Sequence, residues 1–186
     1  MSALHAAAAA AAVRTASLEL MTPSGRCDRR GLLIAALMLL ALQAAQAAAM
    51  IGLSVPHNHP LAVASTGVLL WLSTTAVAKR LHDLSLSAWR ILWAALGVVA
   101  WSVAVGAGVV VAFGPEGIEP GQAGYWTAIV ATMVPVLAMT LWLHFAKGLR
   151  GANAYGPEPA GFGFSRWEAG ESHPAMAAAR PIRPPF

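Results

Sequence analysis

Long apolar runs alternate with short polar segments along most of the sequence. Four of these runs contain no Asp, Glu, Lys or Arg, and they cover residues 31–53, 61–78, 91–113 and 125–146. About 20 consecutive apolar residues in a helix cross the hydrocarbon core of a bilayer. The pattern therefore predicts an all-α membrane protein with four transmembrane helices.

The composition points the same way. Hydrophobic residues make up 58% of the 186 residues and charged residues only 11%, whereas a soluble domain carries about 25% charged residues. The net charge of +4 does not indicate nucleic-acid binding, because the basic residues lie in short groups beside the apolar runs. We expect membrane lipids, other membrane proteins or a second copy of the chain as partners, and no nucleic acid.

The two ends of the chain differ from the apolar middle. Residues 1–23 include an unbroken alanine run and read as a low-complexity extension, in which Met21 is a second candidate for the true start. Residues 160–186 are rich in Gly, Ala and Pro and have no apolar period, which predicts a disordered tail. We expect the transmembrane domain to cover residues 24–159.

Lys and Arg are distributed unevenly between the connections. They occur before the first run, between the second and third runs, and after the fourth run, but the loops at 54–60 and 114–124 have none. The positive-inside rule then predicts that both termini are cytoplasmic. With this topology, the polar segments 24–30, 79–90 and 147–159 share the cytoplasmic boundary.

Polar residues inside the first two runs predict contacts between helices. The first run contains Gln43 and Gln46, and the second contains several Ser and Thr residues. An amide in lipid usually faces another helix, where it finds a hydrogen-bond partner. Charged residues within a membrane usually mark ion paths or proton relays, and their absence from the four runs disfavours a charge-coupled transporter.

Each of the three polar segments contains a short motif. The first, Gly-Arg-x-x-Arg, consists of Gly25, Arg26 and Arg29. The second consists of Arg80, Leu81, His82 and Asp83, followed by Ser87 and Trp89. The third consists of Gly148, Gly151, Asn153, Tyr155, Gly156, Pro157 and Pro159. With these motifs in this order, the chain resembles the family of small bacterial inner-membrane proteins called domain of unknown function 805.

The resemblance covers about residues 24–159 and has some departures. Leu32 and Leu33 stand where the family usually has aromatic residues, and Ser85 and Ala88 stand where it usually has glycines. The resemblance implies a multi-pass protein of the bacterial inner membrane. It implies no established activity.

The polar segments allow two interpretations. In the first, Asp83 pairs with Lys79, Arg80 or Arg26, and the cluster is structural in a non-enzymatic accessory membrane protein. In the second, a basic cytoplasmic pocket of a lipid- or solute-handling protein binds an anionic headgroup, since Arg suits phosphate. The candidate ligand-binding residues for the second interpretation are Arg26, Arg29, Arg80, His82, Asp83, Arg90, Arg150, Asn153 and Tyr155.

Signals for catalysis or metal binding are weak. His82 as a general base beside Asp83 is one enzymatic arrangement, but adjacent residues on a helix point about 100° apart. No nucleophile motif or phosphate-binding glycine loop accompanies them. His57 and His59 lie in one turn, but two ligands do not make a metal site. We therefore expect no enzyme activity, no catalytic residues, no metal and no cofactor, and we expect Cys27 to be a free thiol.

Overall fold

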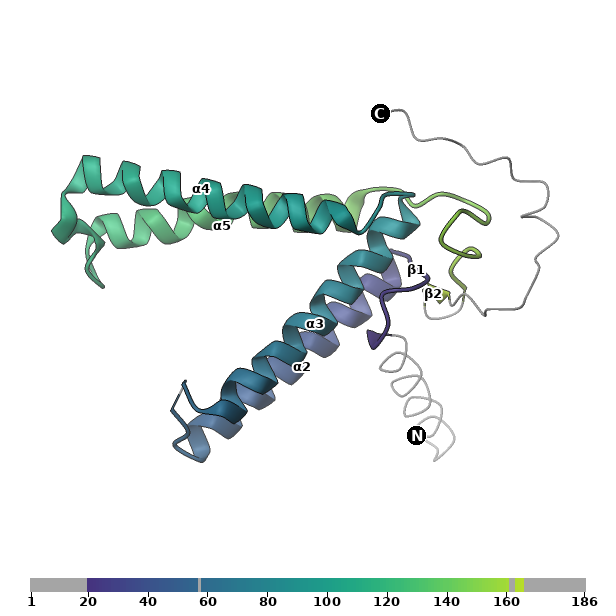
Figure 1. Cartoon of the computed structure of the whole chain (residues 1–186), viewed down its shortest axis with the longest axis horizontal. Coiled ribbons are helices and arrows are strands. Elements are labelled where there is room, and N and C mark those ends of the chain that lie inside the picture. Colours follow the sequence, from purple (N-terminus) through teal and green to yellow (C-terminus); the bar gives the residue numbers. More distant parts are fainter. Residues whose placement is uncertain (1–19, 57, 161–162, 166–186) are drawn as a thin grey trace, which may run out of the picture. The chain divides into compact units, whose positions relative to one another are not determined.

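The computed structural model describes residues 20–56, 58–160 and 163–165 (Figure 1). The helices and strands in chain order are β1 (Arg26–Cys27), α2 (Arg29–Gly52), α3 (Pro60–Asp83), α4 (Trp89–Phe113), the 3-10 helix η1 (Pro115–Ile118), α5 (Ala123–Phe145) and β2 (Phe164–Ser165). The helices α2, α3, α4 and α5 are each long and apolar enough to cross a membrane. They confirm the predicted all-α membrane architecture with four spans.

Helix α3 differs most from the apolar run that predicted it. The run ends at Ala78, but the helix continues through Lys79 and Arg80 to Asp83. These last residues are buried in spite of their charges. The helix can therefore extend beyond the apolar run because its charged end is covered by other parts of the chain.

Two local contacts fix where α2 and α3 begin. The Asp28 carboxylate accepts a hydrogen bond from the Gly31 N–H at 2.8 Å, and the His59 ring accepts one from the Leu61 N–H at 3.2 Å. Each satisfies a backbone donor that the first turn of a helix leaves without a partner. Pro60 at the first position of α3 needs no such partner.

The chain divides into two units, which we describe separately. The first unit contains the described residues up to Ala88 and from Lys147 onward, and the second is Trp89–Ala146. In the first unit α2 and α3 lie side by side (Figure 1). In the second unit α4 and α5 lie side by side and are connected through η1 (Figure 1).

The core of the first unit lies between α2 and α3 and includes a residue from before the first span. Its buried members are Leu20, Ala35, Leu39, Leu72 and Ala76. Small residues such as Ala35 and Ala76 let membrane helices approach closely. The Leu20 carbonyl also accepts a hydrogen bond from the Thr75 hydroxyl at 2.6 Å. The packed core of this unit therefore includes Leu20, which precedes the first span.

Strands β1 and β2 form a short antiparallel ladder. Arg26 pairs with Ser165 and Cys27 with Phe164, and Phe164 also packs against the core between α2 and α3. Residues 164–165 therefore contact the first unit through this ladder and through the Phe164 ring. The remaining tail residues, 161–162 and 166–186, lie outside the described residues, as does His57.

The two glutamines of α2 have different surroundings. Nε2 of Gln46 donates to the hydroxyl oxygens of Ser65 at 2.6 Å and of Thr66 at 3.1 Å. The predicted contact with a neighbouring helix is therefore confirmed for Gln46. Gln43 is exposed on the surface of α2 and makes no such contact with a described residue.

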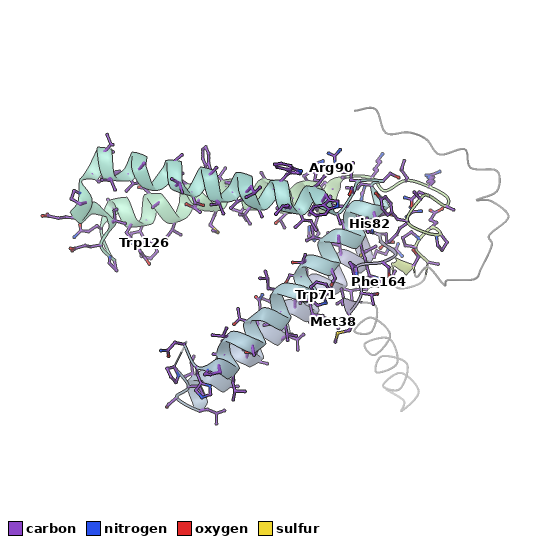
Figure 2. All side chains as sticks on the ribbon, viewed as in Figure 1. Met38, Trp71, His82, Arg90, Trp126 and Phe164 are labelled. Carbon is purple, nitrogen blue, oxygen red and sulfur yellow. The ribbon has the colours of Figure 1, made fainter. Side chains whose placement is uncertain are left out.

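The second unit is a helical hairpin with aromatic residues near its loop. Across the hairpin, the Trp101 indole N–H donates to the Ala131 carbonyl oxygen at 2.9 Å. The Tyr125 and Trp126 rings meet edge to face, with centroids 5.3 Å apart. Figure 2 shows Trp126 and Arg90 at opposite ends of this hairpin. Trp and Tyr favour membrane interfaces, so the loop end of the hairpin suits a bilayer boundary.

Candidate functional site

The first unit brings together parts of all three polar segments. Strand β1, the last turn of α3 and residues 147–156 are in contact there. At the centre is Asp83, which is only 2% exposed. Its carboxylate binds two guanidinium groups, those of Arg26 and Arg80, and we call these three residues the ion-pair cluster.

The geometry of the cluster satisfies both carboxylate oxygens of Asp83. Oδ1 accepts from Nη2 of Arg26 at 2.9 Å and from Nε of Arg26 at 3.2 Å. Oδ2 accepts from Nη1 of Arg80 at 2.5 Å. Arg26 and Arg80 are both 0% exposed. Such deep burial of charge is stable only where charges are paired and hydrogen-bonded, and this cluster meets that condition.

Arg26 also contacts the backbone after α5. Its Nη2 donates to the Leu149 carbonyl oxygen at 2.5 Å, and its Nη1 donates to the carbonyl oxygens of Gly151 at 2.5 Å and Gly156 at 3.4 Å. A guanidinium group has five N–H donors in one plane, and here they face a carboxylate and three carbonyl oxygens. One side chain therefore joins β1, the end of α3 and residues 147–159, which we call the C-terminal segment.

The C-terminal segment also completes the end of α3. The last four carbonyl groups of a helix have no partner within the helix. The Asp83 carbonyl accepts from the Leu149 N–H at 3.0 Å, and the His82 carbonyl accepts from the Asn153 amide at 2.9 Å. A Cβ atom at Gly148 would overlap the Asp83 carboxylate. Glycine at 148 is therefore required for this close approach.

The turn after α3 contains Ser85, one of the two residues at which the chain departs from the glycines that the resemblance implies. Ser85 adopts a φ of 56°, in the left-handed region that glycine reaches with least strain. This conformation would suit the glycine that the resemblance implies at this position. Ser85 stays in this conformation with its hydroxyl accepting from the Asn153 amide at 3.1 Å.

His82 is held by packing rather than by Asp83. Its ring stacks on Tyr155 with centroids 4.0 Å apart and an interplanar angle of 3°. Its Nδ1 lies 3.1 Å from the Gly25 carbonyl oxygen, which fits an N–H donated by the ring to the carbonyl. Figure 2 shows His82 at the end of α3. These contacts explain the histidine as a packing residue between β1 and the C-terminal segment.

Among the described residues, neither Cys27 nor His59 shows an arrangement typical of a reactive or metal centre. The Cys27 thiol is fully buried, and burial together with the nearby Asp28 carboxylate raises its pKa well above the usual value. His59 caps α3. Within residues 20–56, 58–160 and 163–165, no group of three or more His, Cys, Asp or Glu side chains is placed to hold a metal ion.

Next to the ion-pair cluster is a cleft of about 430 Å³ with a basic lining. We call it the basic cleft. Its basic residues are Arg29, Arg30, Arg80, Lys147 and Arg150, and its acidic residues are Asp28, Asp83 and Glu158. Five basic and three acidic side chains leave a balance of +2.

The nine candidate ligand-binding residues are therefore distributed over four places. Those in the ion-pair cluster are Arg26, Arg80 and Asp83, and those beside it at the end of α3 are His82, Asn153 and Tyr155. Arg29 and Arg150 line the basic cleft together with Arg80 and Asp83. Arg90 belongs to the second unit, where it is exposed on α4.

Sequence reasoning missed four charged residues of the cleft, which are Asp28, Arg30, Lys147 and Glu158. Arg30 follows the motif residue Arg29, and Lys147 follows the fourth apolar run. The signal that could have identified both is a basic residue at the end of a predicted helix. Glu158 lies between two prolines and accepts from the Gly151 N–H at 2.7 Å. No pattern in the sequence pointed to that contact.

The four apolar helices define a multi-pass membrane protein. A family model described as protein of unknown function (DUF805) matches residues 20–157. The chain belongs to this family, which confirms the resemblance drawn from the three motifs. The matched region begins at Leu20, the first residue of the packed core, and ends in the segment that contacts Arg26. Comparison with curated proteins and with solved structures found no match.

Proposed function

We propose that this protein is a non-enzymatic structural or accessory component of the bacterial inner membrane, with both termini in the cytoplasm. In this role it associates with other membrane proteins or with further copies of itself. The ion-pair cluster holds the ends of α2 and α3 and the C-terminal segment as one ordered polar surface at the cytoplasmic boundary.

The observation that carries this proposal is the set of contacts made by Arg26. Its guanidinium group pairs with Asp83 and with carbonyl groups from residues 149–156. These donors are used within the protein. Among the described residues, no buried side-chain nitrogen or oxygen lacks a hydrogen-bond partner. A polar cluster satisfied in this way favours a structural role, because a catalytic group must have bonding capacity left for its substrate.

Crosslinking in native membranes tests the proposed association. Epitope-tagged full-length chain is crosslinked in the membrane, and products larger than the monomer are detected through the tag. We expect such products for the wild type and for Arg29→Gln, which removes an exposed charge next to the cluster. We expect Asp83→Asn to lose them, because the surface formed around the cluster opens. Absence of such products from the wild type, or their full retention in a membrane-inserted Asp83→Asn, would refute the proposal.

Reporter fusions test the proposed orientation. A fluorescent protein after residue 186 is expected to mature, because it folds in the cytoplasm. Alkaline phosphatase inserted in the loop 114–124 is expected to be active, because that loop carries two acidic and no basic residues and faces the periplasm in this topology. The reverse pattern would overturn the orientation and, with it, the cytoplasmic position of the cluster.

A further inference from the structure

The basic cleft collects exposed positive charge from two parts of the chain far apart in sequence. Arg30 comes from the first turn of α2, and Lys147 and Arg150 come from the segment after α5. Within the part of the chain that the structure describes, these three side chains form no ion pair. All three are exposed, so a ligand can reach them from outside.

The acidic residues of the cleft are engaged with protein donors. Asp28 caps α2 through the Gly31 N–H, and Glu158 accepts from the Gly151 N–H at 2.7 Å. Asp83 is shared by the two guanidinium groups of the ion-pair cluster. One carboxylate between two guanidiniums leaves the inner side of the cleft positive. The cleft is therefore a place where an anion gains charge attraction and hydrogen-bond donors.

The position of the cleft decides which anion fits best. Helix α2, which is long and apolar enough to cross a membrane, starts at Arg29, so its first turn lies where the hydrocarbon core gives way to headgroups. Leu33, Leu37 and Leu40 follow Arg30 at spacings of three, seven and ten residues, which places them along one face of the helix. They are 51%, 58% and 62% exposed. These three leucines, which we call the leucine track, therefore form an apolar path from the bilayer to the cleft.

We propose that the basic cleft binds the phosphate of an anionic phospholipid, with one acyl chain along the leucine track of α2. Arg30 and Arg150 each present a planar fork of N–H donors that matches the oxygens of a phosphate, and Lys147 adds a third positive charge. The cleft volume of about 430 Å³ is large enough for a phosphodiester with a small headgroup. The cleft shares Arg80 and Asp83 with the ion-pair cluster, but the three side chains proposed to bind the phosphate lie outside the cluster.

Lipid retention by the intact protein tests this site. The full chain, purified in mild detergent, is mixed with equal amounts of phosphatidylglycerol and phosphatidylethanolamine, and retained lipid is counted by native mass spectrometry. The wild type is expected to retain the anionic lipid preferentially. Arg30→Gln, Lys147→Gln and Arg150→Gln each remove one charge from the cleft. Each is expected to weaken retention about fivefold, the effect of about 1 kcal/mol per basic residue near an anionic lipid.

Arg90→Gln is the matched control. It removes one exposed positive charge from the second unit and is expected to change retention less than about twofold, because the cleft keeps all its charges. Equal losses in Arg90→Gln and in the cleft variants would show general surface attraction and overturn the proposal. All four residues are exposed, so the variants are expected to fold, and the thermal unfolding of each is checked before lipid is added.

Two further probes distinguish a lipid from a soluble phosphate. Inorganic phosphate and glycerol phosphate are added as competitors at the concentration of the lipid. Neither is expected to displace the lipid, because neither makes contact with the leucine track. Displacement by either compound, or equal retention of the two lipids by the wild type, would overturn the assignment to an anionic phospholipid.

Discussion

Replacing Arg26 by glutamine tests the energetics of the ion-pair cluster most directly. Arg26 is 0% exposed and contacts the Asp83 carboxylate and three carbonyl groups. Removing one partner of a buried ion pair typically costs about 3–5 kcal/mol, because the other charge stays buried with less compensation. Arg80 keeps its contact with Asp83 in the variant, so we expect a loss near the lower end, about 3 kcal/mol.

The free energy of unfolding of the full chain in mild detergent is measured by denaturant titration. Arg30→Gln removes the same charge from an exposed position in the same part of the chain and serves as the control. Its expected effect is within about 0.5 kcal/mol, as for most surface substitutions. Limited proteolysis of the C-terminal segment provides a second readout, and cleavage within residues 147–159 should increase only in Arg26→Gln.

The double variant Arg26→Gln with Asp83→Asn separates pairing from packing. If the cost of each single change comes from an uncompensated buried charge, removing both groups together costs less than the sum of the two single effects. A loss below about 1 kcal/mol for Arg26→Gln, or strictly additive effects in the double variant, would refute the reasoning. Either result would mean that the cluster is not a buried, mutually dependent unit.

Three further predictions concern single positions, each with its own measurement. Gly148→Ala is expected to lower the free energy of unfolding by about 1–3 kcal/mol, because the new methyl group overlaps a carboxylate of the cluster. Gly67→Ala is the control and is not expected to lower the free energy of unfolding, because a Cβ there has open space around it. Equal losses in the two variants would contradict the overlap as the cause. Cys27 is expected to resist maleimide near neutral pH in the folded protein, because its raised pKa keeps the thiol protonated. It should react after unfolding in detergent, and rapid labelling of the folded chain would contradict its burial. Gln46→Leu is expected to cost about 0.6–1.7 kcal/mol through the lost contacts with two α3 hydroxyls, and a matching loss in exposed Gln43→Leu would argue against that cause.

The four spans could be predicted from sequence because the bilayer imposes a simple requirement. Backbone polar groups in lipid must bond within the segment, so a long uncharged apolar run has few alternatives to a helix. The exact end of α3 could not be predicted in this way. Lys79 and Arg80 look like the polar boundary of a span, but both are fully buried in the fold and the helix continues past them to Asp83.

Isolated apolar anchors also escaped prediction. Leu20 follows a low-complexity stretch, and Phe164 lies in a region rich in glycine and proline. Neither belongs to a periodic pattern, so only the three-dimensional arrangement reveals that both pack against the α2–α3 core. The same limit applies to the cleft. Lys147 and Arg150 line the same cleft as Arg30 because of the fold of residues 147–159. The spacing of these residues along the chain does not predict that they meet.

The site could be predicted in part because buried charge needs a partner. Asp83 is the only acidic residue between Asp28 and Glu116, so a basic neighbour was expected, and Arg26 and Arg80 were two of the three candidates. The structure then divides the basic residues into two groups. Arg26 and Arg80 bind the Asp83 carboxylate. Arg30, Lys147 and Arg150 line the cleft and form no ion pair with Asp83 among the described residues.

This division makes the two proposed roles separable. Arg80 and Asp83 belong both to the ion-pair cluster and to the lining of the cleft, so a change at either position affects stability and lipid binding together. Arg30 and Lys147 belong to the cleft alone. A ligand that binds only the folded protein stabilises it more the tighter it binds. Removing one of these charges should therefore reduce the stabilisation by phosphatidylglycerol but not the stability without lipid. Arg26 lies outside the cleft lining, and its replacement should lower stability with or without lipid. A structural cluster and an anion site can therefore occupy the same end of the helix pair, each with its own experimental signature.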